Sequence, residues 1–207
     1  VKGSQAGAAD LVAALLPKAQ SKDSTIASPA ITELGRIKDP AAAAALIGIF
    51  QTHPEPSVRS SAGYALGGFG PGNEQAADAL IRALTEEKDK YTRNSAASAL
   101  RYYRGDKVFS ALSSALTDSE SSVRKTACDS LRGLGDKRAV SALMPLLRDP
   151  DLGVIGYAKT ALKDLGVSDE DMAKGGITPQ ETLNRYIVEL SKSGWWDEDL
   201  RKKIIET

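Results

Sequence analysis

The sequence predicts an all-α protein: an α-solenoid (superhelix) of about five helix pairs with a C-terminal helical cap. The main observation is a leucine that recurs every 31–34 residues, at Leu34, Leu66, Leu100, Leu131 and Leu162. An alanine stands four residues before each leucine, at Ala30, Ala62, Ala96, Ala127 and Ala158. A fixed period of this length is typical of a stacked repeat array, in which each unit buries a face of its neighbour.

The second helix of each pair is predicted from apolar residues eight and four positions before the leucine, at the leucine, and three positions after it. The earliest of these positions is usually β-branched: Ile26, Val58, Thr92, Val123 and Val154. We expect the alanines where helices cross, because a methyl group lets two backbones approach to about 8 Å. Glycines that follow are expected to end these helices in the left-handed conformation: Gly35, Gly67, Gly68, Gly105, Gly133, Gly135 and Gly166.

The first helix of each pair is predicted at 39–50, 73–84, 106–116 and 136–147, with 8–19 as a degenerate first copy. Aspartate and proline in the turns suit helix starts, and Pro145 should kink its helix. The repeat array then occupies 1–166, as pairs at about 6–37, 39–70, 73–104, 106–134 and 136–166.

Residues 167–207 are predicted to form the C-terminal helical cap, because the terminal units of a solenoid are commonly atypical. Thr178 and Glu181 have the spacing of a capping box, with Pro179 at the first helical position. An apolar stripe follows at Leu183, Tyr186, Ile187 and Leu190, and 195–207 is a last amphipathic segment.

The segment 121–149 resembles a HEAT repeat of the short bacterial kind, which is also found in phycobilin lyase subunits. The shared motif is a Val-Arg opening the second helix, Ala-x-x-x-Leu, a Leu-Gly-Asp turn and a further Ala-x-x-x-Leu. The match at 56–70 is good, 90–106 loses the Leu-Gly, and 24–38 and 152–166 lack the arginine. The resemblance covers about 24–166 and implies an armadillo-like helical repeat fold, but such folds serve many functions.

The charge of the chain is zero in total but unevenly spread. Residues 88–148 hold twelve Lys or Arg against six Asp or Glu, whereas 168–199 hold three against eight. This asymmetry could steer a polar partner, or these could be ordinary solvated helix faces. No apolar run reaches the roughly 18 residues of a membrane span. We expect a soluble protein, favour the cytoplasm, and leave open export of a trimmed or processed chain.

Catalytic, cofactor and metal sites are not predicted. His53 is the lone histidine and has no second ligand for zinc, and the His-Glu pairs of deoxyhypusine hydroxylase are missing. Cys128 lies near the buried stripe and should pack as a small hydrophobe, and with no second cysteine it can form no internal disulfide. The glycines of 67–72 follow no strand, so they are no dinucleotide fingerprint.

The predicted function is a non-catalytic scaffold that binds a partner protein or peptide on its concave face. In HEAT-like stacks the second helices line that face, and tyrosine and arginine are common interface anchors. The candidate partner-binding residues are Tyr64, Asn94, Arg101, Tyr102, Lys125, Asp129, Arg132, Tyr157 and Lys163, beside Asp164. The alternative that they are scattered surface residues stays open.

Two other functions are possible. The resemblance implies a phycobilin lyase-like accessory or catalytic subunit, which would bind a bilin or a bilin-carrying protein. DNA binding would suit the basic middle, although nucleic-acid binders usually carry a stronger positive bias than this balanced chain.

Arg59, Arg93 and Arg124 form a separate column, one residue beyond the β-branched position. We expect a structural ladder, in which acids such as Asp89, Asp118 and Asp149 pair with the arginines of neighbouring repeats. Exposed pairs of this sort would contribute about 0–1 kcal/mol each and set the register of the stack.

Overall fold

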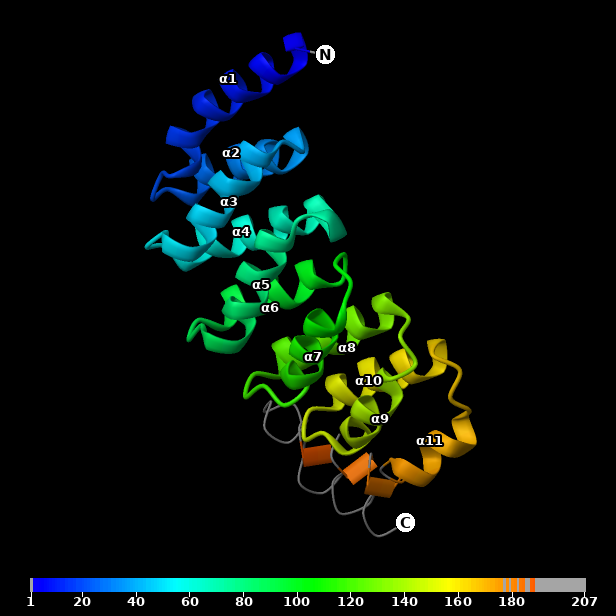
Figure 1. The fold of residues 1–207 in the computed structure, drawn as a ribbon. Coiled ribbons are helices and arrows are strands. Elements are labelled where there is room, and N and C mark those ends of the chain that lie inside the picture. The colour runs from blue at the N-terminus through cyan, green and yellow to red at the C-terminus, as the bar shows by residue number, and fades with distance from the viewer. Residues whose placement is uncertain (1, 177, 179, 182, 185–186, 189–207) are drawn as a thin grey trace.

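The structure is a computed structural model that describes residues 2–176, 178, 180–181, 183–184 and 187–188. Its helices stack in sequence order into one curved array (Figure 1). The first helices of the five pairs are α1 (Lys2–Ala19), α3 (Pro40–Thr52), α5 (Glu74–Glu86), α7 (Asp106–Ala115) and α9 (Ala139–Leu143). The second helices are α2 (Ser24–Ile37), α4 (Pro56–Leu66), α6 (Lys90–Leu100), α8 (Ser121–Leu134) and α10 (Leu152–Asp164). The predicted all-α solenoid of helix pairs is therefore confirmed.

Aspartates in several of the turns cap the N-terminus of the helix that follows. The carboxylate of Asp89 accepts a hydrogen bond from the Thr92 backbone N–H at 2.7 Å, and Asp23 does the same for Thr25 at 2.9 Å. Asp151 likewise accepts from the Val154 N–H at 3.1 Å. Each cap satisfies a backbone donor that the first helical turn leaves without a partner, so these aspartates fix where the helices begin.

The core consists of the repeated leucines and alanines. All five leucines and all five alanines of the repeat are buried, as are Val58, Thr92, Val123 and Val154. The prediction for Ile26 is wrong, because this side chain is 49% exposed and Ala27 takes its buried position. In α2 the buried residues Ala27, Ala30, Ile31 and Leu34 form the apolar stripe, which is turned by one residue relative to the other copies.

The curvature of the stack follows from unequal packing in its two layers. Successive second helices contact one another far more extensively than successive first helices do. Glycines permit this approach, since a Cβ atom on Gly63 would collide with Ser95 and Phe50. The layer of second helices is therefore the shorter, inner one. We call its surface, formed by α2, α4, α6, α8 and α10, the inner face.

The glycine caps are only partly as predicted. Gly135 and Gly166 have the positive φ angles expected of left-handed residues after a helix. Gly105, with φ 112° and ψ 164°, precedes α7 instead of ending α6. Gly35 instead lies inside α2, where a Cβ atom would be 3.2 Å from the Cβ of Ala65, and Lys38 ends that helix with φ 55°. The others expected as caps also lack positive φ: Gly67 and Gly68 in the 3₁₀ helix η1 (Gly67–Gly72), and Gly133 inside α8. Close helix packing, rather than chain reversal, explains Gly35.

Pro145 changes the type of its helix instead of kinking it. The α-helix α9 ends at Leu143 and continues as the 3₁₀ helix η2 (Met144–Arg148). Proline has no N–H to donate to the preceding turn, so the α-helical hydrogen bonds stop there while the chain keeps turning the same way.

The last described helix is α11 (Asp169–Gly175), and Arg148 of η2 binds it through the Gly175 carbonyl oxygen at 3.2 Å. The predicted capping box is present, because the Thr178 N–H donates to Glu181 Oε2 at 2.7 Å and the Glu181 N–H donates to Thr178 Oγ1 at 3.1 Å. Of the apolar stripe beyond it, Ile187 is buried and Leu183 is exposed. Pro179, Tyr186, Leu190 and 195–207 lie outside the described residues.

Candidate partner-binding face

Three of the predicted binding residues are exposed tyrosines on second helices or at their ends. Tyr64 of α4, Tyr102 after α6 and Tyr157 of α10 are 51%, 55% and 48% exposed. A large ring left in water costs free energy that a partner can recover, and tyrosine is enriched among residues that dominate binding. Their positions follow from the repeat, which turns the same side of each second helix outward.

Neighbouring side chains hold two of these rings. The Asn94 side-chain amide donates to Tyr64 Oη at 3.2 Å, and the Thr126 hydroxyl donates to Asn94 Oδ1 at 2.7 Å. The ring of Tyr102 packs against Gly67, and the guanidinium of Arg101 lies 5.7 Å from the ring centre. Rings held in this way lose less conformational entropy when a partner binds.

The charged candidates are paired with acids. Arg101 Nη1 lies 2.8 Å from Asp129 Oδ2, and Arg132 Nη2 lies 2.6 Å from Asp129 Oδ1. Arg132 also reaches Asp164 at 3.1 Å, so Arg101, Asp129, Arg132 and Asp164 form an alternating chain across three repeats. Lys125 pairs with Asp151 at 3.0 Å and Lys163 with Asp169 at 4.0 Å. This part of the inner face therefore presents balanced charge.

Many of the cations in the basic middle of the chain are paired with acids in the same way. Lys90 pairs with Glu120 at 3.3 Å, and Arg138 pairs with Asp136 at 2.6 Å and with Asp106 at 2.9 Å. Some of the acids come from outside the basic segment, as Asp78 does for Lys107 at 3.4 Å. Because counter-charges within the fold occupy these cations, the excess of positive charge in the sequence is a weak indication of phosphate binding.

The arginine ladder has two complete rungs. Arg93 forms a bidentate pair with Asp118, at 2.7 and 2.8 Å, and Arg124 forms one with Asp149, at 2.8 and 2.8 Å. These pairs are largely buried rather than exposed as we expected. Burial opposes ionisation of Asp118, but hydrogen bonds from Arg93 and from the Glu120 N–H outweigh it and lower the pKa of this carboxyl. The fold therefore favours the ionised form of Asp118.

The rung at Arg59 is incomplete. Its Nη1 donates to the carbonyl oxygens of His53 and Pro54, at 2.9 and 3.2 Å, as the other two arginines do in their own turns. Its Nε is buried and has no hydrogen-bond partner among the described residues. Asp89, one of the expected partners, caps α6. The charge of Arg59 acts on Asp89, but the two side chains form no bidentate pair like those at Arg93 and Arg124. Asp118, the partner of Arg93, stands six residues before Arg124. Glu87 stands at the corresponding position, six residues before Arg93, but it lines an outer pocket.

The lone histidine and the lone cysteine both have structural surroundings. His53 is buried at the end of α3, where Nδ1 accepts the Glu55 N–H at 3.1 Å and Nε2 lies 3.2 Å from the Gln20 carbonyl oxygen. It thereby joins the ends of the first two repeats. Cys128 is fully buried, and burial raises the pKa of its thiol to about 12. A thiol in this state is a poor nucleophile.

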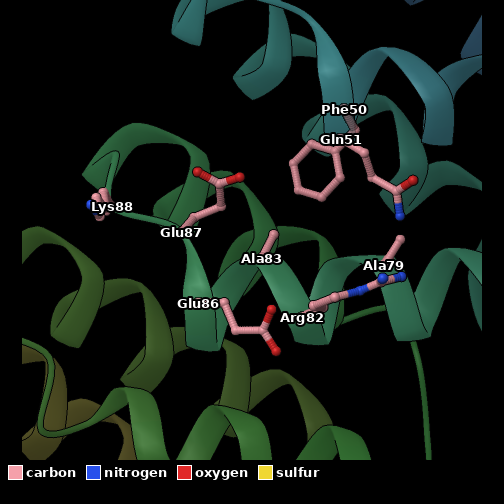
Figure 2. Close-up of a pocket in the computed structure, with 8 residues that line it drawn as sticks. All are labelled: Phe50, Gln51, Ala79, Arg82, Ala83, Glu86, Glu87 and Lys88. Atoms are coloured by element: carbon pink, nitrogen blue, oxygen red, sulfur yellow. The ribbon is translucent and has the colours of Figure 1, made fainter.

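A pocket of about 480 Å³ lies on the outer side, between α3 and α5. Figure 2 shows the side chains that line it. Phe50 and Gln51 form one wall, and α5 with the turn after it supplies Ala79, Arg82, Ala83, Glu86, Glu87 and Lys88. The charged side chains at its rim have both signs. First helices that splay apart on the outside of a curved stack leave such gaps, so we attribute this pocket to curvature.

Two further pockets lie between second helices, on the inner face. One has about 430 Å³ between α2 and α4, and the other has about 350 Å³ between α8 and α10. Tyr64 lines the former and Tyr157 the latter. Sequence reasoning missed the residues that the first repeat contributes, Ser28, Thr32 and Arg36, although they stand at the helix positions used for the other copies.

The described part of the chain contains no helix that is both long and apolar enough to cross a membrane. The same residues include no group of three or more histidine, cysteine, aspartate or glutamate side chains placed to hold a metal ion.

The family model of HEAT repeats matches residues 12–101 and 77–163. A comparison with curated proteins found no match. Among solved structures, the complex of CpcE and CpcF of phycocyanin lyase from Nostoc sp. PCC7120 is similar, at 26% identity and TM-score 0.58. The match covers 73% of this chain and 64% of that one, so this chain spans under two thirds of its length.

A designed armadillo repeat protein in complex with the peptide (KR)4 is similar at 18% identity and TM-score 0.52. That match covers 91% of this chain and 94% of the designed one, and at such low identity it concerns the fold alone. The family model, by contrast, matches well over half of the chain in sequence. The chain therefore belongs to the HEAT-repeat family.

Proposed function

We propose that this protein is a non-catalytic scaffold that binds an extended segment of a partner protein along its inner face. The observation that carries the proposal is the set of exposed tyrosines, Tyr64, Tyr102 and Tyr157, beside the paired charges of Arg101, Asp129, Arg132 and Asp164. Apolar rings would supply the affinity, while the balanced charges at the rim would select against mismatched partners.

The test is selection of peptides from a random library on the intact chain, followed by affinity measurements using fluorescence anisotropy. Replacement of all three tyrosines with serine should weaken binding of the selected peptides at least about tenfold, because such residues dominate interface energetics. Leu11→Ser, at an exposed apolar residue of the first helix α1, is the matched control and should leave affinity unchanged. Selected peptides that bind the tyrosine variant as well as the wild type would contradict the proposal.

A second candidate is a role as a lyase subunit that binds a bilin or a bilin-carrying protein. It is supported by the 26% identity with the CpcE and CpcF structure, which reaches 73% of this chain. The test is to mix the protein with a free bilin and with a bilin-carrying protein, and to record the pigment absorbance. The candidate is rejected when neither mixture shows a spectral shift or a complex.

We also propose that the chain divides at residue 166 into the array and a cap. Met172 of α11 is buried, and Gly175 lies against Met144 and Leu147 of η2. Residues from 167 onward would then cover the last repeat, as a solenoid end requires.

A further inference from the structure

The inner face has four furrows between successive second helices, and side chains fill the middle two. Between α4 and α6, Asn94 bonds to Tyr64 and the Tyr102 ring covers Gly67. Between α6 and α8, the Thr126 hydroxyl bonds to Asn94, and the Arg101 side chain lies over Gly133 and bonds to Asp129. The first and last furrows hold the pockets of about 430 and 350 Å³. The open furrows are thus separated by three steps of the stack.

The two pockets have similar linings. Each is lined by a tyrosine ring, two glycines, a threonine and an arginine, together with a few other residues. The first is lined by Ser28, Thr32, Gly35, Arg36, Ser61, Tyr64, Ala65 and Gly68, and the second by Asp129, Arg132, Gly153, Gly156, Tyr157 and Thr160. Only Gly156 has open space at the position that a Cβ atom would take, whereas Gly35, Gly68 and Gly153 lie close to side chains of neighbouring residues.

The charged groups and the threonine hydroxyls of both pockets already have partners. The hydroxyls of Thr32 and Thr160 donate to carbonyl oxygens of their own helices, at 2.9 and 3.0 Å. Arg36 pairs with Glu33 at 2.6 Å, and Arg132 pairs with Asp129 and Asp164. An incoming charge would find no free counter-charge here, whereas an apolar side chain would gain contact with the ring and with aliphatic atoms. Both pockets therefore fit uncharged, apolar side chains.

The spacing of the pockets indicates how one ligand could reach both. Neighbouring packed helices lie about 8–10 Å apart, so three steps correspond to about 24–30 Å. An extended chain advances about 3.3 Å per residue, so about seven to nine residues cover this distance. Two anchors on one chain bind more tightly than either alone, because the second binds at a high effective concentration.

We propose, resting on the proposed function, that the α2/α4 and α8/α10 pockets bind two apolar side chains of one extended peptide, about seven to nine residues apart. The segment between these anchors crosses the filled furrows, next to Tyr102 and the paired Arg101 and Asp129. The occupant is thus a peptide segment with two apolar anchors rather than a highly charged one.

The experiment uses the library-selected peptides and the intact chain. In an alanine scan, two apolar positions about seven to nine residues apart should dominate affinity, and altering the number of residues between them should weaken binding at least about tenfold. Thr32→Phe and Thr160→Phe each fill one pocket at an exposed position, and each should reduce affinity to that of a peptide with a single anchor. Thr85→Phe is the control, because Thr85 is exposed on α5 and bonds to its own helix in the same way.

Affinity that is indifferent to anchor spacing, or to both pocket-filling variants, overturns the assignment. Should the selected peptides still depend on the three tyrosines in that case, the scaffold function stands and only the two-pocket inference fails. Self-association in analytical ultracentrifugation that Thr32→Phe abolishes would assign the pockets to a second copy of the chain, which also overturns it. Circular dichroism melting verifies that each variant is folded.

Discussion

Arg124 and Asp149 form a bidentate ion pair buried between the fourth and fifth helix pairs. Both N–O distances are 2.8 Å, and the side chains are only 11% and 7% exposed. Arg124 Nη1 also donates to the carbonyl oxygens of Asp118 and Ser119, at 2.8 and 3.2 Å. One side chain therefore joins its own turn to the next repeat, and the same geometry recurs at Arg93 and Asp118.

Replacement of Arg124 should strongly destabilise the protein. Arg124→Met leaves the Asp149 carboxylate buried without its cation, and we expect a loss of about 3–5 kcal/mol in the free energy of unfolding, measured by chemical denaturation. Arg59→Met is the control within the chain, because Arg59 makes the same carbonyl contacts without a carboxylate partner. Its loss should be less than half as large. Equal losses for the two variants would show that the ion pair of Arg124 and Asp149 adds nothing to the free energy of unfolding.

The incomplete rung at Arg59 should be repairable. Glu87→Asp places the shorter carboxylate found at Asp118 in the corresponding position, and we expect it to pair with the buried Nε of Arg59. We expect a gain of about 1 kcal/mol in the free energy of unfolding, since hydrogen bonds to charged groups stabilise by this order. The reciprocal change, Asp118→Glu, should destabilise the rung at Arg93. A gain in stability from both changes would contradict the role assigned to side-chain length.

The alanine column should not tolerate larger residues. Ala96 is fully buried in α6, so Ala96→Leu should cost about 1–3 kcal/mol through overpacking. Ala44→Leu, at an exposed position of α3, is the matched control and should be nearly neutral. Thermal unfolding monitored by circular dichroism measures both. A neutral Ala96→Leu would mean that the repeat has room at this position.

Asp151 should make stability depend on pH in acid. Burial opposes its ionisation, but hydrogen bonds from Ser121, Lys125 and the Val154 N–H outweigh burial and lower the pKa from 3.8 to about 2. Because the folded pKa lies below the unfolded one, the stabilisation is complete above about pH 4 and is lost as the pH falls towards about 2.

Asp151→Asn should therefore lower the free energy of unfolding by up to about 2 kcal/mol at neutral pH and flatten its decline between about pH 4 and 2. Asparagine can still cap α10, so the helix start is preserved. Unfolding measured across this pH range tests the prediction, with the exposed Asp10→Asn as control. An unchanged slope for Asp151→Asn would refute the assignment.

The helix pairs could be predicted from the sequence because each repeat buries its apolar stripe against an immediate neighbour. Thr92, Ala96 and Leu100 are four residues apart, so they lie on one side of α6, and that side is buried as their spacing predicts. The approach fails where a neighbour differs, as at Ile26 beside α1, and where a glycine serves packing instead of chain reversal, as at Gly35.

Whether the charged binding candidates form ion pairs could not be predicted from the sequence in the same way. Arg101, Asp129 and Arg132 stand at positions that face outward, but whether they pair depends on the distance between neighbouring helices. The pockets of the inner face likewise depend on the distance between neighbouring helices. Gly156 is visible in the sequence, yet only the packed stack shows that no neighbouring helix places an atom within 4 Å of the position that a Cβ atom would take.

The most direct test of the account is to map where a bound peptide lies. A library-selected peptide carrying a benzophenone group would be photo-crosslinked to the intact chain, and the adducts located by mass spectrometry. We predict adducts on the inner helices, near Tyr64, Tyr102 or Tyr157. Adducts confined to the outer helices α1, α3, α5 and α7 would contradict the assignment of the inner face as the binding surface.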